Sequence, residues 1–190
     1  MKYNVVLAES KLRKISKIIK DEKNRKKIEK ALGLKIELKK GFVQVSIKES
    51  KEAALKKYVV EKIFDALALG FPLEKALLLK SPEYVLEKTN IKSRVRSSRL
   101  SDVKARLIGR KGKVKKKIET LSNCSVVLHN NTIAVIGKIE NVNIAGFAIK
   151  ALIRGSPIKR VLKLLERKRD ELEESEEIEP KLFNTISFFL

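Results

Sequence analysis

A pair of glycines three residues apart, with two cations between them, is the feature of this sequence best suited to bind a ligand. Gly109 and Gly112 enclose Arg110 and Lys111. Glycine has no Cβ, so its backbone can adopt a positive φ and come close to another group. We therefore interpret these four residues as a loop whose amide groups and cations grip phosphate.

The loop leads directly into an amphipathic helix. Val114, Ile118 and Leu121 recur at the spacing of one helical face, which predicts a helix over 113–122. The first amide groups of a helix have no partner within it, and the positive end of the helix dipole lies behind them. This helix therefore presents an anion-binding end to the loop, where Lys113 adds a further cation.

Positive charge is concentrated around this loop. Residues 92–117 contain twelve basic side chains and one acidic one, Asp102. Arginine can pair with phosphate through two parallel hydrogen bonds, and such contacts fix position but not sequence. The cations that we expect to contact phosphate are Arg94, Arg96, Arg99, Arg106, Arg110, Lys111, Lys113 and Lys116.

The charge of the whole chain indicates a polyanionic partner. The formal net charge is +21, and residues 1–169 hold 43 basic against 16 acidic side chains. The sequence has neither a long apolar run nor a basic helix with Trp or Phe anchors, which favours nucleic acid over a membrane surface. The N-terminal apolar stretch is too short for a signal peptide, so we expect a cytoplasmic location.

The inventory of reactive side chains argues against an enzyme. The chain has one cysteine, Cys124, and one histidine, His129, while its four aspartates lie far apart in the sequence. Neither a metal site nor a nucleophile–histidine pair can be assembled from these residues. We expect no cofactor, no metal and no catalytic residue, with Cys124 buried as a small hydrophobe. A ribonuclease is therefore a poor alternative.

The chain contains the same unit twice. Residues 66–77 recur as 151–162, with alanine, leucine, glycine, proline and a basic residue at matched positions. Upstream the offset is 90, so that residues 26–29 fall on 116–119. The two offsets, 90 upstream and 85 downstream, differ by five residues, and this difference lies in 48–53 of the first unit. Each unit is expected to close with a helix that glycine ends at C′ and a second helix that proline begins at N1.

Both units show the element order β-α-α-β-β-α. In the first, apolar residues predict two helices before Gly33 and a long helix over 52–69, with strands over 3–7, 34–38 and 42–47, the last two joined by a turn at 39–41. In the second, the same signals predict helices over 102–108, 113–122 and 141–153, and strands over 89–92, 125–128 and 132–136.

The second unit resembles a type I KH RNA-binding domain, because Ile108 and the Gly109–Gly112 loop stand between its first two helices. Two such units, each followed by a Gly-Phe-Pro or Gly-Ser-Pro corner, resemble the Partner-of-Nob-one (Dim-two) family of small-subunit ribosome-assembly proteins, in an archaeal-like form. The resemblance extends over about residues 1–170 and is carried by Arg106 to Gly112, Val114, Ile118-Glu119, Ala134 to Gly137 and Gly155-Ser156-Pro157.

This resemblance implies an α+β fold of two tandem type I KH domains, each a three-stranded antiparallel sheet packed against helices, with an extra helix after each. The implied divisions are a KH domain over 1–84, a second over 85–169, and an acidic then apolar tail over 170–190. The second domain would bind single-stranded small-subunit rRNA near its 3′ end. The implied protein partners are the Nob-type endonuclease, the dimethyladenosine transferase and the alpha subunit of translation initiation factor two.

The resemblance also implies which residues read the bases. Beside the loop and Ile108, the strand at 125–128 would face unstacked bases. Its residues are Ser125, Val126, Val127 and Leu128. One groove of this kind accommodates about four nucleotides, so we expect modest selectivity.

The first unit departs from the KH pattern. Its aligned positions are Ile19, Lys20, Asp21 and Glu22, which include no glycine and two carboxylates. We therefore expect this unit to act as a scaffold or protein-contact surface. A general tandem-KH factor, exosome-associated or messenger-binding, remains an alternative. The acidic tail is either a solvated helix end or an RNA mimic that folds over the basic groove.

Overall fold

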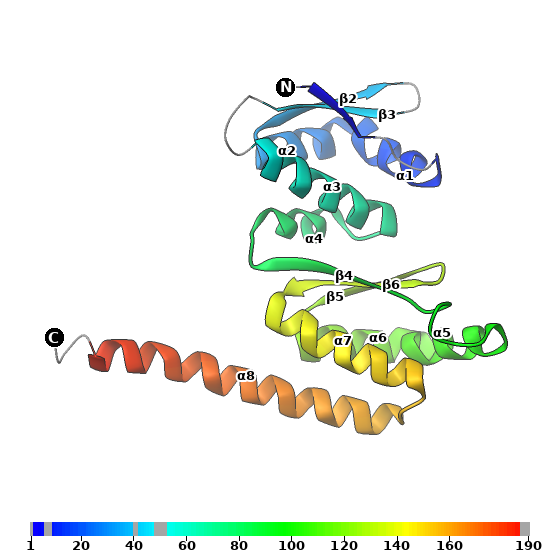
Figure 1. Ribbon diagram of the computed structural model, residues 1–190, viewed down its shortest axis with the longest axis vertical. Coiled ribbons are helices and arrows are strands. Elements are labelled where there is room, and N and C mark those ends of the chain that lie inside the picture. The colour runs from blue at the N-terminus through cyan, green and yellow to red at the C-terminus, as the bar shows by residue number, and fades with distance from the viewer. Residues whose placement is uncertain (1, 6–8, 40–41, 48–52, 187–190) are drawn as a thin grey trace. The chain divides into compact units, whose positions relative to one another are not determined.

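The structure is a computed structural model that describes residues 2–5, 9–39, 42–47 and 53–186 (Figure 1). Contacts between residues divide the chain into two compact units, of which unit 1 is 1–89 with 127–139 and unit 2 is 90–126 with 140–190. This grouping is by contact in space, whereas the boundaries after 84 and 169 follow the repeated sequence.

The order β-α-α-β-β-α is confirmed in both repeats. The first repeat consists of β1 (Lys2–Val5), α1 (Glu9–Lys20), α2 (Glu22–Leu32), β2 (Leu34–Lys39), β3 (Phe42–Ile47) and α3 (Ala53–Leu69), followed by α4 (Leu73–Leu77) and a short 3-10 turn, η1 (Leu78–Lys80). The second consists of β4 (Tyr84–Asn90), η2 (Ser97–Arg99), α5 (Leu100–Ile108), η3 (Arg110–Gly112), α6 (Lys113–Ser122), β5 (Ser125–His129), β6 (Thr132–Lys138) and α7 (Ile139–Arg154), followed by α8 (Ile158–Ile186).

The two sheets share one strand order. The first is antiparallel in the order β1-β3-β2, with Tyr3 opposite Val45 and Leu34 opposite Ile47. The second has the order β4-β6-β5. In each sheet the third strand of the repeat is central. Side chains alternate across the first sheet, so that Val43, Val45 and Ile47 of β3 are buried. Helices α1, α2 and α3 cover one face of that sheet (Figure 1).

A matched hydrogen bond supports the alignment of the repeats at an offset of 90. Glu29 of α2 accepts a hydrogen bond at Oε1 from the backbone N–H of Ile36 in β2, at 2.8 Å. Glu119 of α6 accepts the equivalent bond from Val126 in β5, at 2.9 Å. In both repeats, therefore, a carboxylate on the second helix fixes the start of the strand that follows it.

Removing the Glu119 carboxylate should destabilise the fold. Val126 is buried, so Glu119→Ala leaves its N–H without a partner, at a cost of about 1–3 kcal/mol. Glu119→Gln keeps an acceptor oxygen and loses only the half-exposed ion pair with Lys115, so we expect a cost below about 1 kcal/mol. Chemical denaturation measures both variants, and equal losses would contradict the assigned hydrogen bond.

The corner after each repeat has the same backbone geometry. Gly70 and Gly155 both have positive φ, +101° and +108°. The residue after each glycine closes the turn, since Phe71 N–H donates to the Ala66 carbonyl at 3.2 Å. These glycines end α3 and α7 as expected.

The position of the corner prolines is a correction. We expected proline at N1, but Pro72 is the N-cap of α4, where its carbonyl accepts hydrogen bonds from the N–H groups of Lys75 and Ala76. Pro157 likewise precedes α8 by one residue. The N-cap residue contributes its carbonyl rather than its N–H to the first turn, so proline loses no hydrogen bond there.

The opening strand of the second repeat begins earlier than expected. We predicted 89–92, whereas β4 covers Tyr84–Asn90. The side chain of Asn90 accepts a hydrogen bond from the N–H of Lys92 at 2.9 Å, and this local turn ends the strand. Three predicted features lie partly outside the described residues: residues 6–7 of the 3–7 strand, residues 40–41 of the 39–41 turn, and residues 48–52 of the 48–53 stretch that holds the difference between the repeats.

The core of unit 1 draws on both repeats. Ala134 and Ile136 of β6 are buried in one cluster with Phe64, Leu67 and Phe71, from α3 and the corner after it. Unit 1 therefore uses strand residues of the second repeat to complete the core around α3.

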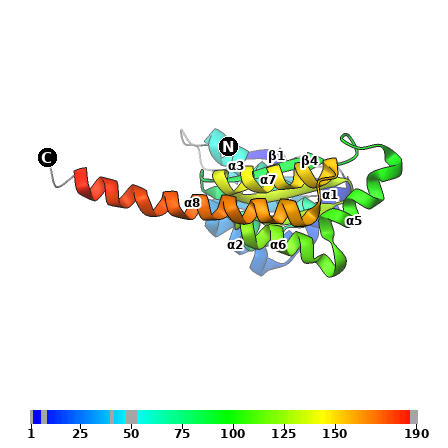
Figure 2. The same cartoon turned by 90° about the horizontal axis from the view of Figure 1, so that it is seen from below.

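In unit 2, α8 contacts α6 and then continues past it as one helix to residue 186 (Figure 2). The acidic part of the tail is therefore helical, and residues 187–190 lie outside the described residues. Within the described part of the chain, every helix falls short of the length or the apolar character needed to cross a membrane.

Candidate nucleic-acid interface

The loop between α5 and α6 is held by backbone conformations that favour glycine. Gly109 ends α5 with φ +72° and ψ 172°, and Gly112 precedes α6 with φ +74°. Lys111 between them also has a positive φ, +52°. The N–H of Gly112 donates to the carbonyl of Gly109 at 3.1 Å, which closes a tight turn. The chain thus reverses within four residues.

The two glycines are required for different reasons. A Cβ on Gly109 would lie 2.9 Å from the backbone nitrogen of Val114 and 2.8 Å from its Cβ. A Cβ on Gly112 would meet nothing within 4 Å. Packing against α6 therefore excludes a side chain at 109, whereas only the backbone conformation favours glycine at 112.

The start of α6 is open to an anion. Its N-cap is Gly112, which has no side chain to accept from the first amide groups. Arg110, Lys111 and Lys113 at this end of the helix are exposed. Amide groups, helix dipole and exposed cations lie together here, and a combination of this kind is suited to phosphate.

The equivalent helix start in the first repeat is already occupied. Asp21 is the N-cap of α2, where its Oδ1 accepts from the N–H of Lys23 at 3.0 Å. Its Oδ2 accepts from the side-chain amide of Asn24 at 2.8 Å. Helix α1 runs to Lys20 and α2 begins at Glu22, so one residue stands where the second repeat has a loop. The chain's own carboxylate takes the place of an external anion.

Seven of the eight cations assigned to phosphate contact are exposed. They are Arg94, Arg96, Arg99, Arg110, Lys111, Lys113 and Lys116. Arg106 differs from these seven, because it is half-buried and its Nη2 donates to the carbonyl of Ser156 at 2.6 Å. Its Nε is buried without a hydrogen-bond partner in the described structure. Arg106 therefore ties α5 to the corner between α7 and α8.

The strand assigned to base reading is corrected at one position, Val126. Val126 is 1% exposed and its N–H is used by Glu119. Val127 is partly buried against the core of unit 1, next to Gly70. The buried side chain of Val126 is therefore not available to a base, whereas Val127 keeps partial exposure. Ser125 and Leu128 are half-buried, and Ile108 beside the loop is 39% exposed.

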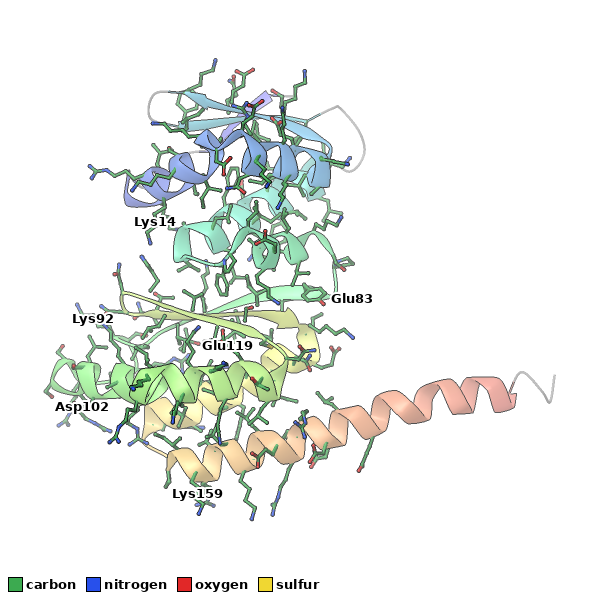
Figure 3. The ribbon with its side chains drawn as sticks, turned by 180° about the vertical axis from the view of Figure 1, so that it is seen from behind. Lys14, Glu83, Lys92, Asp102, Glu119 and Lys159 are labelled. Carbon is green, nitrogen blue, oxygen red and sulfur yellow. The ribbon has the colours of Figure 1, made fainter. Side chains whose placement is uncertain are left out.

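Glu119 has a structural role at the site that sequence reasoning did not assign to it. It holds the start of β5 in place beside α6, and Figure 3 labels it among the side chains of α6. The signal was present in the sequence, because Glu29 and Glu119 coincide at the offset of 90. A polar residue repeated at the same place in both units indicates a shared structural bond.

The single cysteine is structural, as expected. Cys124 is buried between α6 and β5, and burial raises the pKa of its thiol to about 11. A thiol with such a pKa stays protonated and unreactive at neutral pH. Among the described residues, no group of three or more histidine, cysteine or acidic side chains is placed to hold a metal ion.

The single histidine pairs with a cation. Nε2 of His129, at the end of β5, lies 2.6 Å from Nζ of Lys14 in α1, and Lys14 also donates to the carbonyl of Ala68 at 3.1 Å. Burial, and then the positive charge of Lys14, lower the pKa of His129. The neutral ring can therefore accept a hydrogen bond at Nε2 from the Lys14 ammonium.

This contact predicts a loss of stability in mild acid. The folded pKa of His129 lies below its unfolded value, so the unfolded chain binds the proton more readily. The contribution of neutral His129 to the free energy of unfolding is complete above about pH 6.5. It is lost as the pH falls through the pKa of His129 in the folded chain. The free energy of unfolding, measured in urea at about pH 7.5 and about pH 5.5, should differ less between the two pH values for His129→Asn than for the parent chain. Equal differences would exclude the contact as the cause.

Comparison with known proteins gives a consistent picture. A family model for the second KH domain of PNO1, described as a eukaryotic-type KH domain of type I, matches residues 85–170. A KH domain-containing protein of Methanocaldococcus jannaschii is 36% identical over 150 residues, which cover 78% of this chain and 66% of that protein. The RNA-binding protein PNO1 of Oryzias latipes is 34% identical over 62% of this chain and 50% of its own length.

Relatives named pre-rRNA-processing protein PNO1, from Aspergillus fumigatus and Schizosaccharomyces pombe, are 32% and 34% identical. The chain covers 42% and 41% of their lengths, so it spans about half or less of the eukaryotic relatives it matches.

Solved structures agree. Dim2p of Pyrococcus horikoshii is 31% identical, with a TM-score of 0.73 over 88% of this chain and 99% of that one. A complex of a/eIF2alpha, aDim2p and rRNA from the same organism matches with 31% identity and a TM-score of 0.75, over 90% of this chain and 95% of that one.

Proposed function

The chain belongs to the PNO1/Dim2 family of KH-domain proteins, and from that premise we propose that it binds single-stranded small-subunit rRNA near its 3′ end during ribosome assembly. Binding would take place through the second KH domain, proposed as residues 85–169. The first KH domain, 1–84, would act as a scaffold or protein-contact surface. The tail, 170–190, would be a solvated helix end or an RNA mimic.

One observation carries the proposal. The α5–α6 loop leaves the start of α6 open and surrounds it with exposed cations, whereas Asp21 closes the equivalent end of α2. The two sites have the same place in the repeat and differ in whether a phosphate can enter. The open site is therefore the one suited to a nucleic-acid backbone.

The recognition mechanism divides between backbone and bases. Phosphates would meet the loop amides and the cations Arg110, Lys111 and Lys113, and this contact sets the register of the strand. Ser125, Leu128 and Ile108 remain available, by exposure, for contact with unstacked bases. The proposed activity is binding, which is what the KH RNA-binding family supports.

The proposed partners follow the relatives. The homologous archaeal protein forms a complex with a/eIF2alpha and rRNA, and we propose both as partners of this chain. The Nob-type endonuclease and the dimethyladenosine transferase are further proposed partners in the same assembly step, which we place in the cytoplasm. The first repeat is better suited to contact protein than RNA, because Asp21 and Glu22 would repel phosphate.

Crosslinking the protein to RNA in its own cells, followed by sequencing of the bound RNA, tests this function. We expect one dominant peak near the 3′ end of small-subunit rRNA. Binding sites scattered over messenger RNA would instead favour a general tandem-KH factor. In vitro, affinity for the crosslinked sequence should fall steeply as salt rises from about 50 to about 200 mM, because phosphate contacts release counterions. A flat response would contradict a phosphate-dominated mode.

A further inference from the structure

An open apolar groove lies in unit 1, away from the α5–α6 loop in sequence. It has a volume of about 470 Å³ and lies between the first half of α3 and the corner from η1 to β4. Leu55 and Tyr58 of α3 line it and are 63% and 56% exposed. With Lys62 they follow the spacing of one helical face, i, i+3 and i+7. Two large apolar side chains of α3 are thus left uncovered by the described chain.

The groove reaches the edge of a sheet. β4 is the outer strand of the order β4-β6-β5, so only one of its edges pairs within that sheet. Tyr84 and Leu86 point toward the core of unit 1, and Val85 between them points to the opposite face. All three line the groove. The groove therefore touches three consecutive residues of an outer strand, and backbone groups on the unpaired edge of such a strand can pair with another chain.

The charge of the groove selects an acidic occupant. Two of the described residues that line it are lysines, Lys62 and Lys80, and none is acidic. Nζ of Lys62 lies 5.0 Å from the centre of the Tyr58 ring, so the cation is held over the aromatic face at the rim. Glu83, labelled in Figure 3, precedes β4 and is not among the lining residues.

We propose that this groove is a docking site for an extended acidic segment of a partner protein, which adds to β4 as a further strand. An apolar side chain of the segment packs on Leu55 and Tyr58, and its carboxylates pair with Lys62 and Lys80. Backbone pairing gives such a complex its affinity, and alternate side chains give its specificity.

A peptide fits this site better than RNA. An RNA strand cannot continue the hydrogen-bond ladder of β4, and the floor of the groove is largely aliphatic. Tyrosine beside aliphatic residues is typical of the centre of protein interfaces. The proposal does not rest on RNA binding by the second repeat.

Selection of short random peptides displayed on phage, with the full-length chain as bait, tests the proposal. We expect enriched peptides in which acidic and apolar residues alternate. A synthetic copy of the most enriched peptide should bind at least about tenfold more weakly to the Leu55→Ser, Tyr58→Ser variant, because a central aromatic anchor often contributes that much. Both side chains are exposed, so the variant should fold. Phe147→Ser, which removes a 52% exposed aromatic ring on α7, is the matched control and should bind normally.

Hydrogen exchange locates the peptide. Amide groups of β4 should exchange more slowly in its presence if it adds a strand. The Arg110→Asp, Lys111→Asp variant should bind the peptide unchanged, which separates this site from the RNA loop. The proposal is overturned if selection yields no acidic–apolar pattern, if the Leu55, Tyr58 variant binds as well as the parent chain, or if oligouridylate crosslinks to Tyr58 and displaces the peptide.

Discussion

Replacing Arg110 and Lys111 with aspartate should weaken binding to single-stranded rRNA by about 100-fold or more, since each charge-assisted hydrogen bond contributes about 1.5–3 kcal/mol. Both side chains are exposed, and neither is used by the core. Lys111 has a positive φ, which aspartate tolerates better than lysine. The midpoint temperature of thermal unfolding should therefore stay close to that of the parent chain. Fluorescence anisotropy with the rRNA 3′ fragment measures the affinity.

The first repeat supplies the control for this charge reversal. Lys20→Asp with Lys23→Asp makes the same change in net charge near the closed helix start, and we expect it to weaken binding only slightly. Charge reversal at the loop should also reduce the slope of log affinity against log salt by about 2, one for each lost phosphate contact. Equal effects from both variants would mean that overall charge, and not the α5–α6 loop, carries the binding.

Gly109→Ala should destabilise unit 2 by about 2–5 kcal/mol, the sum of a forbidden backbone conformation and an overpacked contact. The added Cβ meets the backbone of Val114, which cannot move without shifting the start of α6. We expect the helical circular-dichroism signal to be lost at a lower urea concentration than in the parent chain. Affinity for RNA should be lost as well.

Gly112→Ala is the matched variant, because its glycine also has a positive φ but its Cβ would meet nothing within 4 Å. We expect a cost of about 1–2 kcal/mol from the left-handed conformation alone. A second reference is Gly33→Asn. Gly33 ends α2 with φ +63°, and the equivalent residue of the second repeat is Asn123 with φ +48°, so this exchange should be nearly neutral. If Gly109→Ala proved as mild as Gly112→Ala, close packing against Val114 would not explain the glycine.

The repeat, the element order and the loop could be predicted from the sequence, because each depends on residues near one another in the chain. Helix α6 begins and ends where Val114, Ile118 and Leu121 indicated. The bounds of β4 could not be predicted in this way. We expected a strand over 89–92, whereas the side chain of Asn90 turns the chain and ends β4 there.

The roles of Arg106 and Val127 depend on partners far away in the sequence. Arg106 donates to Ser156, fifty residues later. Val127 packs against the core of unit 1 beside Gly70. A local charge pattern does not distinguish an exposed arginine from Arg106, whose guanidinium is hydrogen-bonded within the fold. Alternation in a strand likewise does not show which of its two faces is buried. Only the fold distinguishes the cations that remain available to RNA.

The contrast between the two helix junctions has a consequence for how such a site can arise. Relative to the offset of 90, α1 ends two residues later than α5 and α2 begins one residue earlier than α6. Residues 19–22, which include the capped corner at Asp21, therefore align without a gap with residues 109–112 of the open loop. Point substitutions alone can convert one into the other, so a duplicated unit of this kind can gain or lose its ligand without any insertion or deletion in its gene.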